Sequence, residues 1–251
     1  MNSEHRVAII TGGAAGIGRA CAMRFAREGF HVVIGDVSPD DGAQTLEALE
    51  EIGAGAVFET GTIADEAFCK RVADIAVERW GCIDVLVANA ANRNFSRLID
   101  ATEREWDEML AVNLKGTAFS CKAVLPHMIR QRSGAIVLIS SVHYQAGRKE
   151  MPIYDATKAG IVSVAKSLAL DHAADGIRVN AICPGLTITD FHIRKAIREG
   201  RSVDELKQTR VGALERPADP SEIAAAVYFM ASDEASFITG QALMVDGGSS
   251  I

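Results

Sequence analysis

The sequence lacks a long apolar run, a basic run and any closely spaced pair of cysteines. None of its apolar stretches approaches the ~18 residues that a membrane-spanning helix needs. The first residues, Met1 to Arg6, are polar and lead straight into a β-branched run, unlike a secretory signal. We therefore expect a cytoplasmic protein without a membrane partner.

Clustered positive charge is also missing. The chain carries 26 Lys and Arg against 33 Asp and Glu, a net charge of −7, and both signs are mixed along its length. We therefore expect no nucleic-acid partner.

The cysteines are scattered, odd in number and without C-x-x-C spacing, which predicts reduced thiols rather than disulfides or a zinc site. No H-E-x-x-H motif is present, and we expect no metal. The cysteines are Cys21, Cys69, Cys82, Cys121 and Cys183.

Short β-branched runs alternate with longer amphipathic stretches. Nearly continuous apolar runs are typical of strands in a parallel sheet whose two faces are both covered by helices. The alternation predicts an α/β protein with a Rossmann-type doubly wound parallel sheet, helices on both faces and a single domain spanning 1–251. Strands are expected at 7–10, 31–34, 83–88, 135–139 and 177–182, and a final strand begins at Ala242.

One segment departs from this rhythm. Residues Leu186 to Arg216 are polar and irregular, which predicts a lid-like helical insertion over a site at about 186–216. The alternative interpretation is a segment that runs over the surface without covering a site.

A glycine-rich turn, Thr11-Gly-Gly-Ala-Ala-Gly-Ile-Gly18, separates the first expected strand from the first expected helix. Glycine permits a tight turn at Gly12, close approach of a phosphate at Gly16 and helix–strand packing at Gly18. Free N–H groups at the helix start attract a pyrophosphate. A P-loop is excluded, because no Lys-Ser or Lys-Thr follows the glycines. The turn predicts dinucleotide binding by Gly12, Ala15, Gly16, Ile17 and Gly18.

Asp36 closes the second expected strand, about 20 residues beyond the turn. A carboxylate at this position accepts hydrogen bonds from the adenine-ribose hydroxyls and repels a 2′-phosphate. Ala15 and Val37, where a compensating cation could stand, are neutral. NAD is therefore favoured over NADP, and a helix cap or turn residue is the alternative interpretation of Asp36.

Tyr154-Asp-Ala-Thr-Lys158 opens an expected helix that runs to about Ala174. The i, i+4 spacing places the phenol and the ammonium on one face. A phenol has a pKa near ~10, and a neighbouring cation lowers it. Bringing that pKa to about 7 requires roughly 4 kcal/mol of preferential stabilisation of the phenolate. Taken alone, the pair is also typical of an ordinary helix surface.

Together these motifs resemble the short-chain dehydrogenase/reductase family, in its compact single-domain branch, from Val7 to Gly248. The resemblance rests on the glycine turn, the Tyr154–Lys158 motif and Ser141, which lies 13 residues before Tyr154. It also rests on three further matches: Asn113, Pro184-Gly185-x-x-x-Thr189 and Val245-Asp-Gly-Gly248.

The resemblance implies a catalytic role for four residues. Tyr154 would act as the general base in alcohol oxidation, and Lys158 would lower its pKa and hold the nicotinamide ribose. Ser141 would orient the substrate oxygen, and Asn113 would bind a water that links Lys158 to solvent.

The resemblance also implies further coenzyme contacts. Asn89 and Ala90 would flank the adenosine, and Pro184-Gly185 the nicotinamide. The backbone of Ile188 and the hydroxyl of Thr189 would contact the carboxamide.

Two departures from the family pattern are visible. Ala91 stands where the family has the glycine of Asn-Asn-Ala-Gly, and Thr62 stands where an aspartate often lies near the adenine, with Asp65 three residues further on.

The residues expected around the substrate are polar. Several donors in one cleft favour a sugar, polyol or hydroxy acid over a steroid or acyl chain. Ser141, Tyr154, Arg93, His143, Gln145 and Arg148 are the expected substrate residues, joined by Asn92, Asn94, Lys149, Glu150, His192, Arg194 and Lys195 as candidates for the cleft wall.

These inferences predict an NAD-dependent oxidoreductase acting on the CH–OH group of a small polar alcohol. A 3-oxoacyl thioester reductase shares the same motifs, although such enzymes usually prefer NADP, and a non-catalytic NAD-binding regulator is the third possibility. The family resemblance also implies a homotetramer that uses the tyrosine-bearing helix, including Ile161, Val164, Leu168 and Leu170, and the C-terminal strand.

Overall fold

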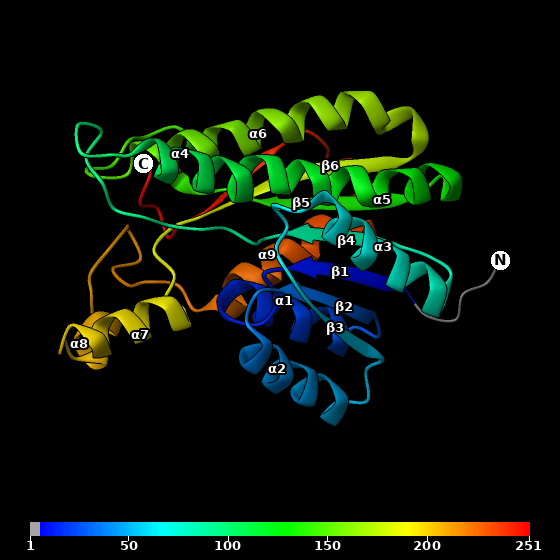
Figure 1. The fold of residues 1–251 in the computed structure, drawn as a ribbon, viewed down its shortest axis with the longest axis horizontal. Coiled ribbons are helices and arrows are strands. Elements are labelled where there is room, and N and C mark those ends of the chain that lie inside the picture. Colours follow the sequence, from blue (N-terminus) through cyan, green and yellow to red (C-terminus); the bar gives the residue numbers. More distant parts are fainter. Residues whose placement is uncertain (1–5) are drawn as a thin grey trace.

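Residues 6–251 are described by a computed structural model, and within them seven parallel strands form one sheet. Their spatial order is β3-β2-β1-β4-β5-β6-β7 (Figure 1). The order reverses between β1 and β4, which is the switch point where α/β sheets bind ligands. The predicted doubly wound fold is confirmed. The strands are β1 (Val7–Thr11), β2 (His31–Asp36), β3 (Ala56–Thr60), β4 (Val85–Ala88), β5 (Gly134–Ile139), β6 (Ile177–Pro184) and β7 (Ala242–Val245).

Helices cover both faces of the sheet. Figure 1 shows α5 and α6 on one side of the strands and α1 and α2 on the other. Along β1, Val7 and Ile9 pack into the core beneath α3, α5 and α6, whereas Ala8 and Ile10 pack against α1 and α9. This alternation explains why the strands are apolar at every position. The helices are α1 (Gly16–Arg27), α2 (Pro39–Glu51), α3 (Glu66–Trp80), α4 (Glu103–Met109), α5 (Thr117–Gln131), α6 (Pro152–His172), α7 (Asp190–Arg198), α8 (Val203–Lys207) and α9 (Pro220–Ala231).

The helix bearing Tyr154 starts two residues earlier than expected. Pro152 occupies the first turn of α6, where its missing N–H costs no hydrogen bond. Tyr154 therefore lies in the first turn, at the carboxyl-terminal edge of the sheet.

A π-helical segment, Leu110–Gly116, connects α4 to α5. Its wide turn brings Gly116 against Ile63, and a Cβ atom at Gly116 would lie 2.8 Å from the Ile63 carbonyl oxygen. The Thr117 hydroxyl donates to the Asn113 carbonyl at 2.7 Å. Such segments are frequent at functional sites, and Asn113 lies within this one.

The irregular segment at 186–216 contains α7 and α8, which project beside the sheet (Figure 1). Two contacts attach it to the glycine turn and to α2. The Gly16 N–H donates to the Asp190 carboxylate at 2.8 Å, and Arg194 pairs with Asp41. Among residues 6–251, no helix has both the length and the apolarity to cross a bilayer.

The core beneath α1 generates a stability prediction. Phe25 is completely buried, and its ring contacts those of Phe30 and Tyr228 at centroid distances of 5.1 and 5.5 Å. Phe25→Ala should lower the free energy of unfolding by about 3–5 kcal/mol, measured by urea unfolding of the coenzyme-free protein. Phe25→Leu, which leaves a smaller cavity, should cost less. Equal midpoints for Phe25→Ala and the unaltered protein would contradict this packing.

Candidate active site

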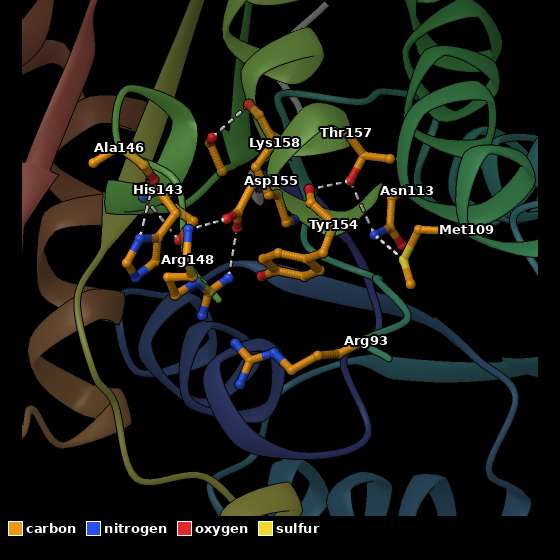
Figure 2. Close-up of polar contacts among 12 residues, drawn as sticks. Arg93, Met109, Asn113, His143, Ala146, Arg148, Tyr154, Asp155, Thr157 and Lys158 are labelled. Carbon is orange, nitrogen blue, oxygen red and sulfur yellow. Dashed lines mark hydrogen bonds and ion pairs between the residues drawn. The ribbon is translucent and has the colours of Figure 1, made fainter. Parts of the chain in front are cut away.

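A cleft of about 740 Å³ opens at the carboxyl ends of β4, β5 and β6. Three of the four expected catalytic residues line it: Ser141, Tyr154 and Lys158. The fourth, Asn113, is fully buried behind the cleft wall. The structure thus brings together residues from the end of β5, the first turns of α6 and the π-helical segment (Figure 2).

Tyr154 and Lys158 point into the cleft from successive turns of α6. The Lys158 Nζ atom lies 5.4 Å from the centre of the Tyr154 ring and donates a hydrogen bond to the Ile139 carbonyl at 2.8 Å. Only 2% of Lys158 and 6% of Tyr154 are exposed to solvent. The ammonium is therefore desolvated and held close to the phenol, as the i, i+4 spacing predicts.

Opposing effects set the pKa of Tyr154. Burial raises it, whereas the positive charges of Lys158, Arg93 and Arg148 lower it, and the net result is a pKa below the ordinary value of 10.0. The pKa of Lys158 also lies below its ordinary value, because burial disfavours the charged ammonium more than the phenol favours it. The Arg93 and Arg148 guanidinium carbons each lie 5.2 Å from the ring centre (Figure 2).

Ser141 stands at the end of β5, where it caps a short 3₁₀ turn. Its hydroxyl oxygen accepts a hydrogen bond from the His143 N–H at 3.3 Å. The hydroxyl proton remains free to donate to a substrate oxygen. The adjacent Ser140 donates to the Lys158 carbonyl at 2.8 Å and so fixes β5 against α6.

Asn113 ties the loop after β4 to α6. Its amide nitrogen lies within hydrogen-bond distance of the Asn92 carbonyl at 3.0 Å, Thr157 Oγ1 at 3.2 Å and Met109 Sδ at 2.9 Å, and its oxygen accepts from the Asn92 N–H at 2.7 Å. These contacts give Asn113 a positioning role in this structure. Its link through water to Lys158 remains a prediction. Thr157, 44 residues away in sequence, could not have been found from spacing.

The glycine turn forms a second, smaller cavity of about 370 Å³. Gly12 and Gly16 have positive φ angles of 65° and 55°. A Cβ atom at Gly12 would lie 2.7 Å from the Ala90 Cα, and one at Gly18 would lie 1.9 Å from the Gly12 carbonyl oxygen. Gly12 and Gly18 are therefore required by close backbone packing and Gly16 by its positive φ angle, which fits a cradle for a dinucleotide. Ala15 and Ile17 also line this cavity.

Asp36 lines the same cavity. Its carboxylate accepts hydrogen bonds from the Ala14 N–H at 3.0 Å and the Ser38 N–H at 3.1 Å, so it serves as a turn residue as well. Two bonds leave lone pairs for ribose hydroxyls. Thr62 lines the cavity, whereas Asp65 instead caps α3 by accepting from the Ala67 N–H. Of these two residues, Thr62 is therefore the one that faces the small cavity.

The loop at Ala88–Ala91 keeps its contacts despite the replaced glycine. Ala91 does not have a positive φ angle, so an L-residue is accommodated without strain. The Asn89 side chain donates to the Thr11 and Gly12 carbonyls at 3.1 and 2.8 Å, and Ala90 packs against Gly12. Asn89 therefore braces the glycine turn.

The residues at the end of β6 and just after it line two different cavities. Pro184, Gly185 and Thr189 line the main cleft. Ile188 differs from the expectation: its side chain lines a separate cavity, and its N–H donates to the Ala218 carbonyl at 3.0 Å. That bond belongs to an isolated parallel β-bridge between Thr187 and Ala218, which the sequence pattern did not predict.

The expected substrate residues divide into two groups. Arg93, His143 and Arg148 line the cleft, with Asn92, Asn94 and His192. Gln145 is exposed and lies outside the cleft wall, which corrects the expectation, because the chain turns outward after the 3₁₀ segment. Four further candidates also lie outside that wall: Lys149, Glu150, Arg194 and Lys195.

Some residues of the site were not anticipated from the sequence. Asp155 pairs with Arg148 at 2.8 Å and also accepts from its backbone N–H. Because Asp155 directly follows Tyr154 in the sequence, this adjacency could have indicated that Asp155 lies near the site. Phe191 and Met109 add apolar surface to the cleft.

Within residues 6–251, no cluster of three or more His, Cys, Asp or Glu side chains could hold a metal ion.

The phenol's environment predicts an unusual titration. The chain has three tyrosines. Subtracting the tyrosinate absorbance of Tyr154→Phe from that of the unaltered protein should isolate one ionisation centred below pH 10, because nearby cations favour the phenolate. In Lys158→Met, which removes the ammonium but keeps the apolar stem, that step should move to higher pH. A step at or above pH 10 in the unaltered protein would contradict this electrostatic description.

Comparisons with known proteins agree with this geometry. A family model described as enoyl-(acyl carrier protein) reductase matches residues 12–250. A 3-oxoacyl-(acyl-carrier-protein) reductase of Thermotoga maritima is 37% identical over 99% of this chain and 99% of its own length. Glucose 1-dehydrogenase 2 of Bacillus subtilis is 36% identical over 97% of this chain and 94% of its own. The structure of L-sorbose reductase from Gluconobacter frateurii with NADPH and L-sorbose matches with a TM-score of 0.93 at 28% identity, covering 98% of this chain and 97% of that one.

Proposed function

The chain belongs to the short-chain dehydrogenase/reductase family, and we propose that it is an NAD-dependent member that moves a hydride between nicotinamide and the hydroxyl-bearing carbon of a small polar alcohol. One observation carries the proposal. A buried phenol, Tyr154, lies beside a buried ammonium, Lys158, in a cleft lined by both polar and apolar residues. This arrangement suits proton transfer to and from a substrate oxygen.

Four residues would orient the substrate oxygen and transfer its proton. The Ser141 hydroxyl would donate to the substrate oxygen and orient it against the Tyr154 phenol. Tyr154, with its lowered pKa, would accept the hydroxyl proton during oxidation and return it during reduction. Lys158 would stabilise the phenolate, and Asn113 would position the loop and relay the proton outward. When bound, the nicotinamide supplies the hydride chemistry.

The coenzyme would lie along the glycine turn. Gly12, Ala15, Gly16 and Ile17, which line the small cavity, would hold the pyrophosphate and adenosine side, and Gly18 would keep the turn packed against the helix. Asp36 would accept the ribose hydroxyls, with Asn89 and Ala90 nearby. Pro184, Gly185 and Thr189 would lie on the nicotinamide side, and the segment at 186–216 would close over the bound coenzyme as a lid.

Two features support NAD rather than NADP. Asp36 would repel a 2′-phosphate, and among the described residues that line the small cavity there is no lysine or arginine to offset this repulsion. The family includes NADPH-binding members such as L-sorbose reductase, so the preference depends on these residues of this chain.

The cleft walls favour a polar substrate. His143, Arg93 and Arg148 would contact it, together with amide groups from the loop after β4. Related proteins named for glucose, galactose and sorbose share this fold. A sugar, polyol or hydroxy acid is therefore the proposed substrate class.

A 3-oxoacyl thioester reductase is the second candidate. It is supported by the 37% identity with the Thermotoga maritima reductase. The carboxylate at Asp36 counts against it, because thioester reductases usually prefer NADP and a carboxylate repels the 2′-phosphate.

We also propose a cytoplasmic homotetramer. Among the described residues the cysteines form no disulfide, as in proteins of reducing compartments. Leu170 on α6 and Phe237 before β7 are 83% and 103% exposed, so they would lie in contacts between subunits. Ile161, by contrast, is buried within the subunit core.

Activity with a panel of alcohols tests the proposed function. With NAD, the protein should oxidise polar secondary alcohols, sugars or hydroxy acids, and Tyr154→Phe should bind NADH normally but lose turnover by several orders of magnitude, because it lacks the proton acceptor. NADH fluorescence measures binding and its absorbance measures turnover. Normal turnover by Tyr154→Phe, or a panel in which only steroids or acyl thioesters react, would contradict the proposal.

Coenzyme preference tests the role of Asp36. Hydrogen bonds to a charged group contribute about 1.5–3 kcal/mol, so Asp36→Ala should lower the preference for NADH over NADPH by about tenfold or more. Affinities come from fluorescence titration. Asp40→Asn removes an exposed carboxylate outside the small cavity and should leave the ratio unchanged. A strong NADPH preference in the unaltered protein would favour the thioester-reductase candidate instead.

A further inference from the structure

Arg93 projects from the loop after β4 to the face of the Tyr154 ring (Figure 2). Its guanidinium carbon lies 5.2 Å from the centre of that ring and 5.5 Å from the centre of the Phe191 ring. The two rings hold a planar cation by cation–π attraction. The guanidinium is therefore placed beside the hydroxyl at which the proposed reaction occurs.

The charge of Arg93 is not neutralised by a carboxylate. Among the ion pairs of residues 6–251, Arg148 has Asp155 as its partner, but Arg93 has none. Its Nη1 atom instead lies 3.2 Å from His192 Nε2. Burial and the charge of Arg93 lower the pKa of His192 to about 4, so the imidazole is neutral near pH 7 and carries no charge of its own.

His192 fixes Arg93 in place without cancelling its charge. Its Nδ1 atom lies 2.9 Å from the Thr189 hydroxyl, which orients the ring. The Thr189 N–H also donates to Nδ1, at 3.4 Å, so the imidazole is held at the start of α7. One of the five N–H donors of Arg93 is used here, and others remain free to bind a ligand.

The acidic residues in the cleft wall have other partners. Glu105 accepts hydrogen bonds from the Thr102 backbone and hydroxyl and from Asn94. Glu108 pairs with Arg104. Near the phenol, Arg93 and Lys158 are therefore the cations without a carboxylate partner among the described residues. Of these two, Lys158 donates its hydrogen bond to the Ile139 carbonyl.

We propose that Arg93 binds the carboxylate of the substrate, which makes the substrate a short 2- or 3-hydroxy acid and the product the corresponding oxo acid. A planar guanidinium with free N–H groups matches a carboxylate in geometry and charge. Its place over the phenol ring requires the acid group to lie close to the reacting carbon. A neutral sugar would leave this charge unpaired. The inference rests on the proposed function and narrows its substrate class.

Matched substrates test the inference. With NAD, kcat/KM should be higher for 3-hydroxybutyrate and lactate than for their uncharged amides, 3-hydroxybutyramide and lactamide, for whichever pair reacts. Arg93→Gln should lower this acid-to-amide ratio by about tenfold to hundredfold, and Arg93→Lys should lower it less. Because both members of a pair use the same phenol, any effect of Arg93 on the pKa of Tyr154 cancels in the ratio.

Arg97→Gln is the matched control. It removes an exposed guanidinium from the same loop, outside the cleft wall, and should leave the ratio unchanged. An acid-to-amide ratio that Arg93→Gln leaves unchanged would overturn the inference, even if both substrates reacted more slowly.

Binding of a non-reacting acid separates this inference from the proposed function. Butyrate should alter NADH fluorescence saturably in the enzyme–NADH complex, butyramide should not, and Arg93→Gln should abolish the butyrate response. If butyrate bound in this way but no alcohol reacted, the proposed function would fail and the carboxylate site would stand. If neutral alcohols reacted but butyrate did not bind, the carboxylate site would fail and the proposed function would stand.

Discussion

The positive charge of Lys158 beside the buried hydroxyl of Tyr154 is the constraint on which the rest of the site depends. An ammonium that is only 2% exposed is costly without a counter-charge, and its hydrogen bond to Ile139 satisfies only part of its donor capacity. Ionisation of the phenol relieves this cost, so each group favours the charged form of the other. Burial therefore strengthens the coupling that proton transfer requires, because the surroundings screen it weakly.

Two segments far apart in the sequence meet around this pair. Asn113, from the π-helical segment, holds the loop at Asn92, and that loop carries Arg93 over the phenol. His192, from the segment at 186–216, contacts Arg93 from the other side. The electrostatics of Tyr154 thus depend on both segments. A change in the position of α7 would alter the charge next to the phenol as well as the shape of the cleft.

The coenzyme side depends on backbone packing rather than on charge. Gly12, Gly18 and Ala90 approach so closely that a side chain at either glycine would overlap the backbone. Asn89 secures this contact by donating to two carbonyls of the turn. In the same turn, the Gly16 N–H donates a hydrogen bond to the Asp190 carboxylate at the start of α7. The coenzyme cradle and the segment at 186–216 are therefore directly connected.

The sequence by itself determined the sheet, the covering helices and most of the site, because these follow from local patterns. Apolar runs specify strands buried on both faces, glycines specify a tight turn, and i, i+4 spacing puts Tyr154 and Lys158 on one face. Only the tertiary structure decided which polar residues reach the cleft: Gln145, Lys149 and Glu150 lie outside its wall, whereas Arg93 and His192, 99 residues apart, meet there. The π-helical segment and the hydrogen bond from Ile188 to Ala218 were likewise not predictable. Such contacts join distant segments, and the direction of a side chain at a loop depends on what packs around it rather than on its neighbours in sequence.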